Sequence, residues 1–313
     1  MERNLKRQRS DLDNLATIIM PVKNGVPLLI DAIESINSQT VNPAKVILSD
    51  NNSKDNTIEF FKNHLKKSIK LEIYSSNKDI GAMENFFRCI NKVETNYFCW
   101  LAHDDYFASN WLEENLKVHF RNKDCITSFG ETIFFNESGI RKYPVGINKT
   151  TNVPKSYSKG NLIKFIKERQ LFGVFYEFGL HNTSSFKKAF FSEKQISKLN
   201  SIKCGGDTCL VLSLLSEGSL CNTRKTQFHR RLRENSDGCE VSKTNLLFRI
   251  FILELPWSYF IDVSNWIALT YKKRRINILI LLIITSRLQT FKKITQRTSI
   301  ELKKFMKTFI KLF

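Results

Sequence analysis

The sequence lacks the features that define several large classes of protein. Its 313 residues include only 12 glycines and 6 prolines, which excludes collagen-like and low-complexity chains. The longest nearly continuous apolar stretch, residues 276–286, is shorter than the roughly 20 residues that a membrane-spanning helix needs. Residues 1–14 form a charged leader without an apolar run, so we expect no secretory signal and a cytoplasmic protein.

Cysteine motifs are also missing. The seven cysteines are scattered and never spaced as CxxC, so we expect neither a disulfide framework nor a zinc site. They are expected to be small, buried, apolar side chains. With 42% apolar and 25% charged residues, the chain has the composition of a globular protein with a sizeable core.

Acidic residues are fewer than basic ones. The chain has 30 Asp and Glu against 49 Lys and Arg, a formal net charge of +19. Residues 241–313 alone hold 14 Lys and Arg but only three acids. A basic, apolar-rich segment of this kind suits either nucleic acid or the anionic surface of a membrane, and composition does not choose between them.

Apolar strand patterns alternate with helical stripes along the first 120 residues. Strands are predicted at residues 16–22, 45–49, 69–74 and 97–102, with helices from residue 27 and over 55–65, 81–93 and 109–120. This alternation predicts an α/β fold with a doubly wound, mainly parallel sheet flanked by helices.

The pattern is less regular in the rest of the chain. Two strands (125–129 and 131–135) are followed by a polar loop (142–159), three helices (161–170, 186–199 and 207–217) and a last strand (220–229). Helices are expected again beyond residue 240. We therefore divide the chain into the leader, an α/β domain over residues 15–240 and a basic, amphipathic helical tail over residues 241–313.

Polar side chains follow each of the first four predicted strands. In an open parallel sheet, ligands bind at the carboxyl ends of the strands, where helix N-termini also point. The residues at these ends are Pro21 and Asn24, then Asp50 and Asn52, then Asn77 and Gly81, and finally His103, Asp104 and Asp105.

Two interpretations of these residues compete. Ser53, Asp55, Asn77 or Asp79 could simply cap the helices that follow. Capping explains the adjacent Asp104 and Asp105 less well, because two neighbouring carboxylates repel each other unless a cation or hydrogen-bond donors compensate. Mg²⁺ or Mn²⁺ suits a small set of oxygen ligands and takes further ligands from phosphate.

This favours a nucleotide diphosphate as the ligand. The phosphate loops of many kinases and dehydrogenases, GxxxxGK[ST] and GxGxxG, are absent from the sequence.

Five segments together resemble the family 2 glycosyltransferases of the GT-A fold. These enzymes transfer a sugar from a nucleotide-diphosphate donor with inversion. The segments occur in the order typical of that family within residues 15–120: IIMPVKN (18–24), SINSQT (35–40), SDNNSKDNT (49–57), NKDIG (77–81) and WLAHDD (100–105). The resemblance implies a nucleotide-binding half over residues 15–120 and an acceptor half over 121–240.

The resemblance also implies roles for the residues at the strand ends. Asp50 would face the nucleobase, Asp104 would lie near the ribose, and Asp105 would bind the metal that bridges the diphosphate. The other residues expected to bind the nucleotide sugar are Pro21, Asn24, Asn52, Asn77 and Gly81. His103 departs from the family pattern, because many relatives have an acid or a small polar residue there.

The general base of this family is usually an acid at the start of a later helix. Gly205-Gly206-Asp207 matches that pattern, which makes Asp207 the predicted base. A carboxylate within hydrogen-bond reach of the attacking sugar hydroxyl can take its proton. Asp207 could instead only cap its helix, and Glu177 and Glu217 are weaker substitutes for the base.

A basic segment, FHRRLRENS (228–236), resembles the part of the family that closes over the donor. We select His229 and Arg231 as diphosphate ligands, since the planar guanidinium matches phosphate oxygens. The alternative is an ordinary solvated basic surface.

The tail lies outside the resemblance. Its aromatic residues Trp257, Tyr259 and Trp266 and the cluster KKRR (272–275) suit a helix at the surface of an anionic membrane, although packing on the α/β domain or dimerisation would also explain them. We expect a peripheral protein on the inner face of the cell membrane. Its acceptor would be a glycan or a lipid-linked molecule, as in the building of bacterial capsule or O-antigen.

Two other functions compete with this one. A metal-dependent nucleotidyltransferase would also use an acid pair, but residues 21–27 lack the glycine- and basic-rich loop usual in such enzymes. A non-enzymatic nucleic-acid-binding protein would explain the charge, but not the four strand-end motifs. We therefore expect no nucleic-acid partner.

Overall fold

The computed structural model describes residues 9–135, 156–167, 173–190 and 206–231, together with residues 261, 263–267 and 270. The chain divides into two compact units. One comprises Met1–Ser201 and Asp207–Ser236, and the other comprises Ile202–Gly206 and Asp237–Phe313. The sheet and the site described below lie in the first unit. The boundaries that we placed at residues 14, 120 and 240 stay predictions.

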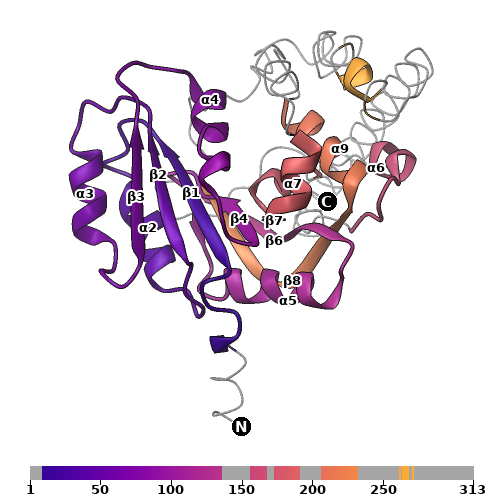
Figure 1. The fold of residues 1–313 in the computed structure, drawn as a ribbon, viewed down its shortest axis with the longest axis horizontal. Helices are drawn as coiled ribbons and strands as arrows, with labels where there is room; N and C mark the ends of the chain where they lie inside the picture. Colours follow the sequence, from indigo (N-terminus) through magenta and orange to yellow (C-terminus); the bar gives the residue numbers. More distant parts are fainter. Residues whose placement is uncertain are drawn as a thin grey trace, which may run out of the picture. The chain divides into compact units, whose positions relative to one another are not determined.

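The first half of the sheet consists of four parallel strands in the order β3-β2-β1-β4, side by side in Figure 1. Every side chain of β1 and β2 is buried, as expected for central strands covered by helices on both faces. The strands are β1 (Ala16–Val22), β2 (Lys45–Asp50), β3 (Lys70–Ser75) and β4 (Tyr97–Trp100), and the helices between them are α2 (Leu29–Asn37), α3 (Thr57–His64) and α4 (Ala82–Phe87).

The same sheet continues beyond β4 with strands of both directions. Strand β7 is antiparallel to β4 and β6, β6 and β8 are parallel, and the two-residue β5 is antiparallel to β8. The predicted α/β fold with a mainly parallel sheet is confirmed. The remaining elements are β5 (Tyr106–Phe107), β6 (Cys125–Phe135), β7 (Leu180–Asn182), β8 (Ser219–Arg231), α5 (Trp111–Arg121), α6 (Leu162–Lys167), α7 (Thr183–Phe190), α9 (Gly206–Glu217), and the 3₁₀ helices η1 (Ile90–Lys92) and η3 (Gly173–Phe178).

The structure corrects three predicted elements. The helix expected over residues 81–93 ends at Phe87 and is followed by η1. The two strands expected within residues 125–135 are one strand, β6, in which Gly130 lets the backbone of β8 approach closely. A Cβ atom on Gly130 would lie 2.3 Å from the carbonyl oxygen of Thr226, so no other residue fits there without a shift. The helix expected from Phe186 begins earlier, at Thr183.

His181 lies at the centre of the core, fully buried among aromatic rings. Its Nε2 is 2.8 Å from the carbonyl oxygen of Glu177, which can only accept, so we assign the ring proton to this nitrogen. Its Nδ1 accepts from the hydroxyl of Thr127 at 2.6 Å. Burial lowers the pKa of His181 to about 3. The neutral ring therefore joins β7 and β6 to η3, the short helix that carries Glu177.

The described cysteines are buried, as predicted, namely Cys89, Cys99, Cys125, Cys209 and Cys221. Cys204 and Cys239 lie outside the described residues, as do most of the predicted tail helices, including Trp257, Tyr259 and residues 272–275. Within the described part of the chain, no helix combines the length and the apolar character that crossing a membrane requires.

Candidate functional site

The loops after β1 and β2 meet at the carboxyl edge of the sheet. Asp50 is the last residue of β2 and lies opposite Val22, the last residue of β1. Its carboxylate is only 3% exposed and accepts from the backbone N–H of Ser53, 3.3 Å from each oxygen. The N–H of Asn51 donates to the carbonyl of Val22 at 2.8 Å. Asp50 is therefore held in a tight turn at the end of its strand.

Two asparagines give these loops their shape. Asn24 and Asn52 have φ angles of 51° and 57°, in the left-handed region that asparagine tolerates better than most residues. The N–H of Asn24 donates to the hydroxyl of Ser53 at 2.9 Å, and its side-chain oxygen accepts from the N–H of Lys54 at 2.8 Å. The hydroxyl of Ser53 thus joins two loops. Asp55 accepts from the N–H of Thr57, the first residue of α3, at 3.2 Å. The N-cap of α3 is Asn56, which forms no side-chain capping bond, so Asp55 is not the cap.

Asp79 is a residue whose importance the sequence analysis missed. Its Oδ2 accepts from Lys23 Nζ at 2.6 Å, and its Oδ1 accepts from Asn51 Nδ2 at 2.7 Å and from Gly81 N–H at 2.9 Å. The hydrogen bond from Lys23 is the main reason why the pKa of Asp79 is lowered to about 2. Asp79 therefore links the loops after β1, β2 and β3. Asn77, in the same loop, is exposed.

The acid pair, Asp104 and Asp105, follows β4 and adjoins the loop after β1. Asp105 is 3% exposed, and its Oδ1 accepts from the backbone N–H of Arg231 at 2.9 Å. The ring of His103 lies 3.2 Å from where a Cβ atom on Gly25 would stand, so this loop packs against the loop after β1. Because β2 and β4 flank β1 and all three are parallel, Asp50 and the acid pair follow strand ends at one edge of the sheet, as predicted.

The two basic residues selected from the sequence lie on β8 beside the acid pair. The ring of His229 stacks on Tyr106, with 4.2 Å between ring centroids and 9° between planes. Arg231 Nη2 pairs with Asp31 Oδ2 at 2.6 Å, and its Nε donates to the carbonyl oxygen of Asp104 at 3.2 Å. Both residues thus lie close to Asp104 and Asp105, and the Arg231 guanidinium is bound to protein acceptors.

The predicted base lies at the start of α9. Asp207 Oδ1 accepts from its neighbour's N–H, Thr208, at 2.6 Å. Glu177, on η3, is half-buried and near enough to Asp207 for their charges to interact: burial raises the pKa of Glu177 to about 8, Asp207 adds to the rise, and Arg230 opposes it. Glu217 lies at the other end of α9, roughly 15 Å along the helix axis, and pairs with Lys188. It is therefore not a substitute base in this site.

The raised pKa of Glu177 predicts how the stability of the protein changes with pH. Because its folded pKa is raised, the folded protein keeps a proton that the unfolded chain releases between about pH 4.5 and pH 8, so its contribution to stability falls as pH rises through that window. One proton changes the free energy of unfolding by at most about 1.4 kcal/mol per pH unit. Glu177→Gln should remove this contribution to the pH dependence of the free energy of unfolding. Melting temperatures measured from pH 5 to pH 8 would show the change. Glu217→Gln is the control for loss of one carboxylate, and equal slopes in wild type and Glu177→Gln would contradict the prediction.

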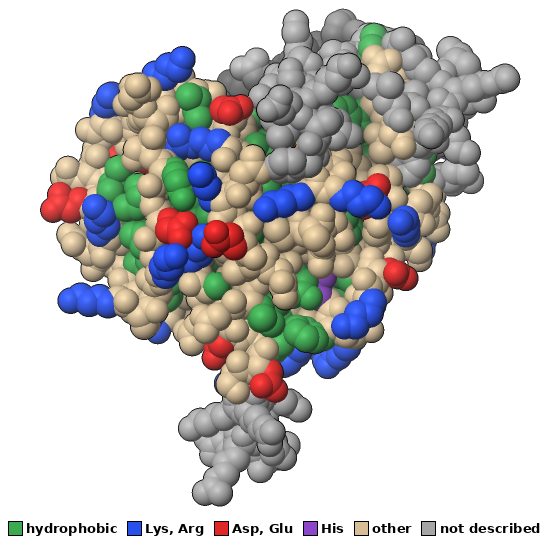
Figure 2. Space-filling model, in the orientation of Figure 1, with side chains coloured by type: hydrophobic (Ala, Val, Ile, Leu, Met, Phe, Trp, Pro, Cys, Tyr) green, Lys and Arg blue, Asp and Glu red, His purple; other side chains and the backbone are tan. Residues whose placement is uncertain are grey.

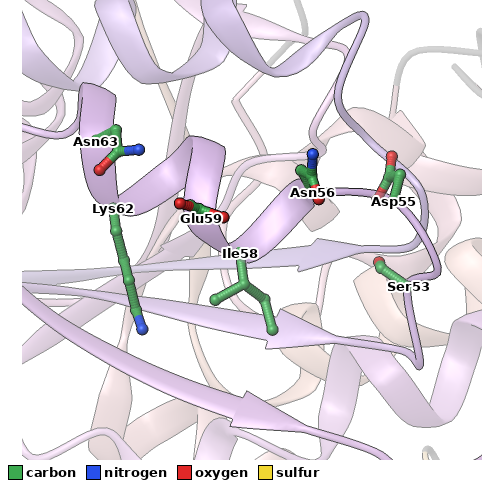
Figure 3. Close-up of a pocket in the computed structure, with 7 residues that line it drawn as sticks. All are labelled: Ser53, Asp55, Asn56, Ile58, Glu59, Lys62 and Asn63. Carbon is green, nitrogen blue, oxygen red and sulfur yellow. The ribbon is translucent and has the colours of Figure 1, made fainter.

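A separate surface pocket of about 500 Å³ lies beside α3 (Figure 3). It is lined by Ser53, Asp55, Asn56, Ile58, Glu59, Lys62 and Asn63. It shares the loop after β2 with the site but includes neither acid of the pair nor Asp207. Among the residues that the structure describes, no group of three or more His, Cys, Asp and Glu side chains is arranged to hold a metal.

Comparison with known proteins decides the family. A sequence model described as Glycosyl transferase family 2 matches residues 17–188, which is more than half of the chain. The chain belongs to this family. The match includes β1 to β4, the acid pair and Glu177, whereas Asp207, His229 and Arg231 lie beyond it.

Several curated glycosyltransferases are similar to parts of the chain. An uncharacterized glycosyltransferase of Rickettsia prowazekii is 32% identical over 127 residues, and one of Rickettsia typhi is 30% identical over 126 residues. Each match covers 40% of this chain and 38% of the relative's length. A Campylobacter jejuni protein named GalNAc(5)-diNAcBac-PP-undecaprenol beta-1,3-glucosyltransferase is 24% identical over 240 residues, 76% of this chain and 72% of that protein.

The fold has a counterpart among solved structures. Residues 1–349 of S. aureus TarS, crystallised with UDP-GlcNAc, superpose with a TM-score of 0.57, covering 85% of this chain and 70% of that one. Because the two sequences are only 12% identical, this similarity supports the fold alone. It agrees with the GT-A-type sheet expected from the sequence.

Proposed function

We propose that the protein is an inverting glycosyltransferase, which moves a sugar from a nucleotide-diphosphate donor to a hydroxyl group of its acceptor. The proposal depends mainly on one observation. Asp50 ends β2 and the acid pair lies in the loop after β4, so both stand at the carboxyl ends of the two strands that flank β1. The proposal is supported by membership of family 2 and by the UDP-GlcNAc bound to the TarS structure.

The nucleoside would lie over the interlocked loops after β1 and β2. Asp50 would accept hydrogen bonds from the base, and Asp104 from the ribose. The other residues proposed to bind the nucleotide sugar are Asn24 and Asn52 in these loops, Pro21 near the end of β1, and Asn77 and Gly81 in the loop after β3. Because Ser53 and Asp79 already fix these loops through hydrogen bonds, little ordering is needed when the nucleotide binds.

Asp105 fits a divalent cation such as Mg²⁺ or Mn²⁺. Its carboxylate is buried and oriented by the N–H of Arg231, and the described residues supply few other ligands. Such a site suits a cation that keeps waters and takes further ligands from phosphate. When bound, the cation stabilises the negative charge of the departing diphosphate.

Asp207 would take the proton of the acceptor hydroxyl. As this proton leaves, the hydroxyl oxygen forms a bond to the anomeric carbon of the sugar. The bond from that carbon to the diphosphate breaks, and its electron pair leaves with the nucleotide. One displacement inverts the anomeric configuration.

A panel of nucleotide sugars tests the function, with melting temperature as readout. We expect one class of nucleotide diphosphate and its sugar conjugate to raise the melting temperature in Mn²⁺, and EDTA to abolish the rise. Release of nucleoside diphosphate from the conjugate on adding acceptor would confirm transfer. Stabilisation by nucleoside triphosphates with release of pyrophosphate would instead favour a nucleotidyltransferase.

The acceptor class is part of the proposal. The undecaprenol in the name of the Campylobacter relative supports a lipid-linked acceptor and a role in building surface polysaccharide. A peripheral position on the inner face of the cell membrane would bring the basic tail to anionic lipid. On the face in Figure 2, the described Lys and Arg side chains are interspersed with Asp and Glu, which does not favour a nucleic-acid surface there.

Sedimentation with liposomes tests the membrane hypothesis. The full-length protein should sediment with anionic vesicles at low salt and be released as the salt concentration rises. Neutral vesicles are the control. Equal binding to neutral and anionic vesicles, or binding to neither, would contradict the hypothesis.

A further inference from the structure

The geometry points to a latch between Asp31 on α2 and Arg231 on β8, which holds the loop of the acid pair in place. We define the latch as the ion pair of these two residues together with the hydrogen bonds from Arg231 to residues 104 and 105. Arg231 is then a positioning residue for Asp105 instead of a ligand of the diphosphate. The inference rests on the proposed function, because it assigns Asp105 to the metal.

Arg231 contacts the loop of the acid pair twice and α2 once. Its backbone N–H donates to Asp105 Oδ1 at 2.9 Å, and its Nε donates to the carbonyl oxygen of Asp104 at 3.2 Å. Its Nη2 lies 2.6 Å from Asp31 Oδ2. One residue at the end of β8 thus ties together two elements that are more than 70 positions apart in the sequence.

The guanidinium is also fixed by packing. Its Cζ lies 4.6 Å from the centroid of the Phe135 ring, at the end of β6, and the Arg231 side chain is only 10% exposed. A planar guanidinium that stacks on a ring and forms directed hydrogen bonds has few other orientations. Turning it toward a diphosphate would break its bonds to Asp31 and Asp104.

The alternative is an ordinary surface salt bridge, which contributes about 0–1 kcal/mol to stability and nothing specific to the site. Asp31 is 45% exposed, as a surface residue would be. However, its partner is nearly buried and binds both the main chain and a side chain of the loop of the acid pair. Loss of Asp31 should therefore release the end of β8 and let Asp105 move.

Binding of Mn²⁺ in the presence of UDP, followed by the EPR signal of free Mn²⁺, tests the latch. Asp31→Asn should weaken Mn²⁺ binding about tenfold, as expected when an outer partner of a metal ligand is lost. Arg231→Lys should have a similar effect, and the double variant should be no worse than the worse single variant. Glu34→Gln is the matched control, since Glu34 is an exposed acid of the same helix.

Hydrogen exchange of the protein without ligands gives a second, independent readout. In Asp31→Asn, the amide of Arg231 and the segment 102–107 should exchange faster than in wild type and in Glu34→Gln. If Asp31→Asn behaves like Glu34→Gln in both measurements, the latch is wrong. If Arg231→Lys weakens UDP binding without Mn²⁺ while Asp31→Asn does not, Arg231 is a direct diphosphate ligand and the latch is also wrong.

Failure of the proposed function would look different. Wild-type protein that binds neither Mn²⁺ nor UDP would remove the metal role of Asp105. The exchange comparison would still decide whether Asp31 and Arg231 hold the loop of the acid pair.

Discussion

Asp207→Asn is expected to lower the rate of sugar transfer by about 10²- to 10⁴-fold, the range in which a general base contributes. Asparagine has nearly the shape of aspartate but cannot take the proton of the acceptor hydroxyl. Its side-chain oxygen can also keep the hydrogen bond from the N–H of Thr208, so the stability of α9 should be nearly unchanged. The substitution therefore separates the two interpretations of this residue. Turnover of the nucleotide sugar, measured beside the melting temperature and UDP binding, provides the test.

Glu217→Gln, at the other end of α9, is the control for that experiment and should keep normal turnover. Normal turnover in Asp207→Asn would show that the base lies elsewhere. Glu177 would then be the next candidate, because it is the carboxyl whose charge interacts with that of Asp207.

Asp105→Ala is expected to reduce transfer by more than about 10²-fold, comparable to the loss of a preorganised group that stabilises developing charge. Unlike Asp207→Asn, it should also weaken UDP binding in the presence of Mn²⁺. Removal of a buried acceptor leaves the Arg231 N–H without its partner, so the variant combines two effects.

Asp105→Asn separates these two effects. Its side-chain oxygen can still accept from the Arg231 N–H, but the amide is a poor ligand for the cation compared with a carboxylate. Asp105→Asn should therefore keep the melting temperature of wild type and lose Mn²⁺-dependent UDP binding, as measured by calorimetry. If UDP binding is equally strong with and without Mn²⁺ in wild type, Asp105 has a different role.

The parallel half of the fold could be predicted because its signals are local. Strands β1, β2 and β4 are mainly apolar runs, and β3 alternates apolar and polar residues. Helical patterns separate them, so the polar residues that follow stand at strand ends even if a predicted boundary is off by a residue or two. The position of Asp50 and of the acid pair at one sheet edge followed from this alternation alone.

The other half could not be predicted in the same way, because it depends on contacts between distant segments. Strands β5 and β7 have two and three residues and show no period of their own. The pairing of Asp31 with Arg231 joins residues 200 positions apart. The closeness of Glu177 to Asp207 likewise depends on how η3 packs. For Asp79, the sequence indicated only a possible helix cap, because its partners Lys23 and Asn51 lie in other loops.

A crystal structure of the full chain with UDP and Mn²⁺ tests the central claim most directly, since the anomalous signal of manganese locates the ion without assumptions. We predict a peak within roughly 2.2 Å of an Asp105 carboxylate oxygen, the distance usual for a small divalent cation, with the uracil beside Asp50. A manganese peak and UDP density in the pocket beside α3, with Asp50 and Asp105 touching neither, would contradict the account.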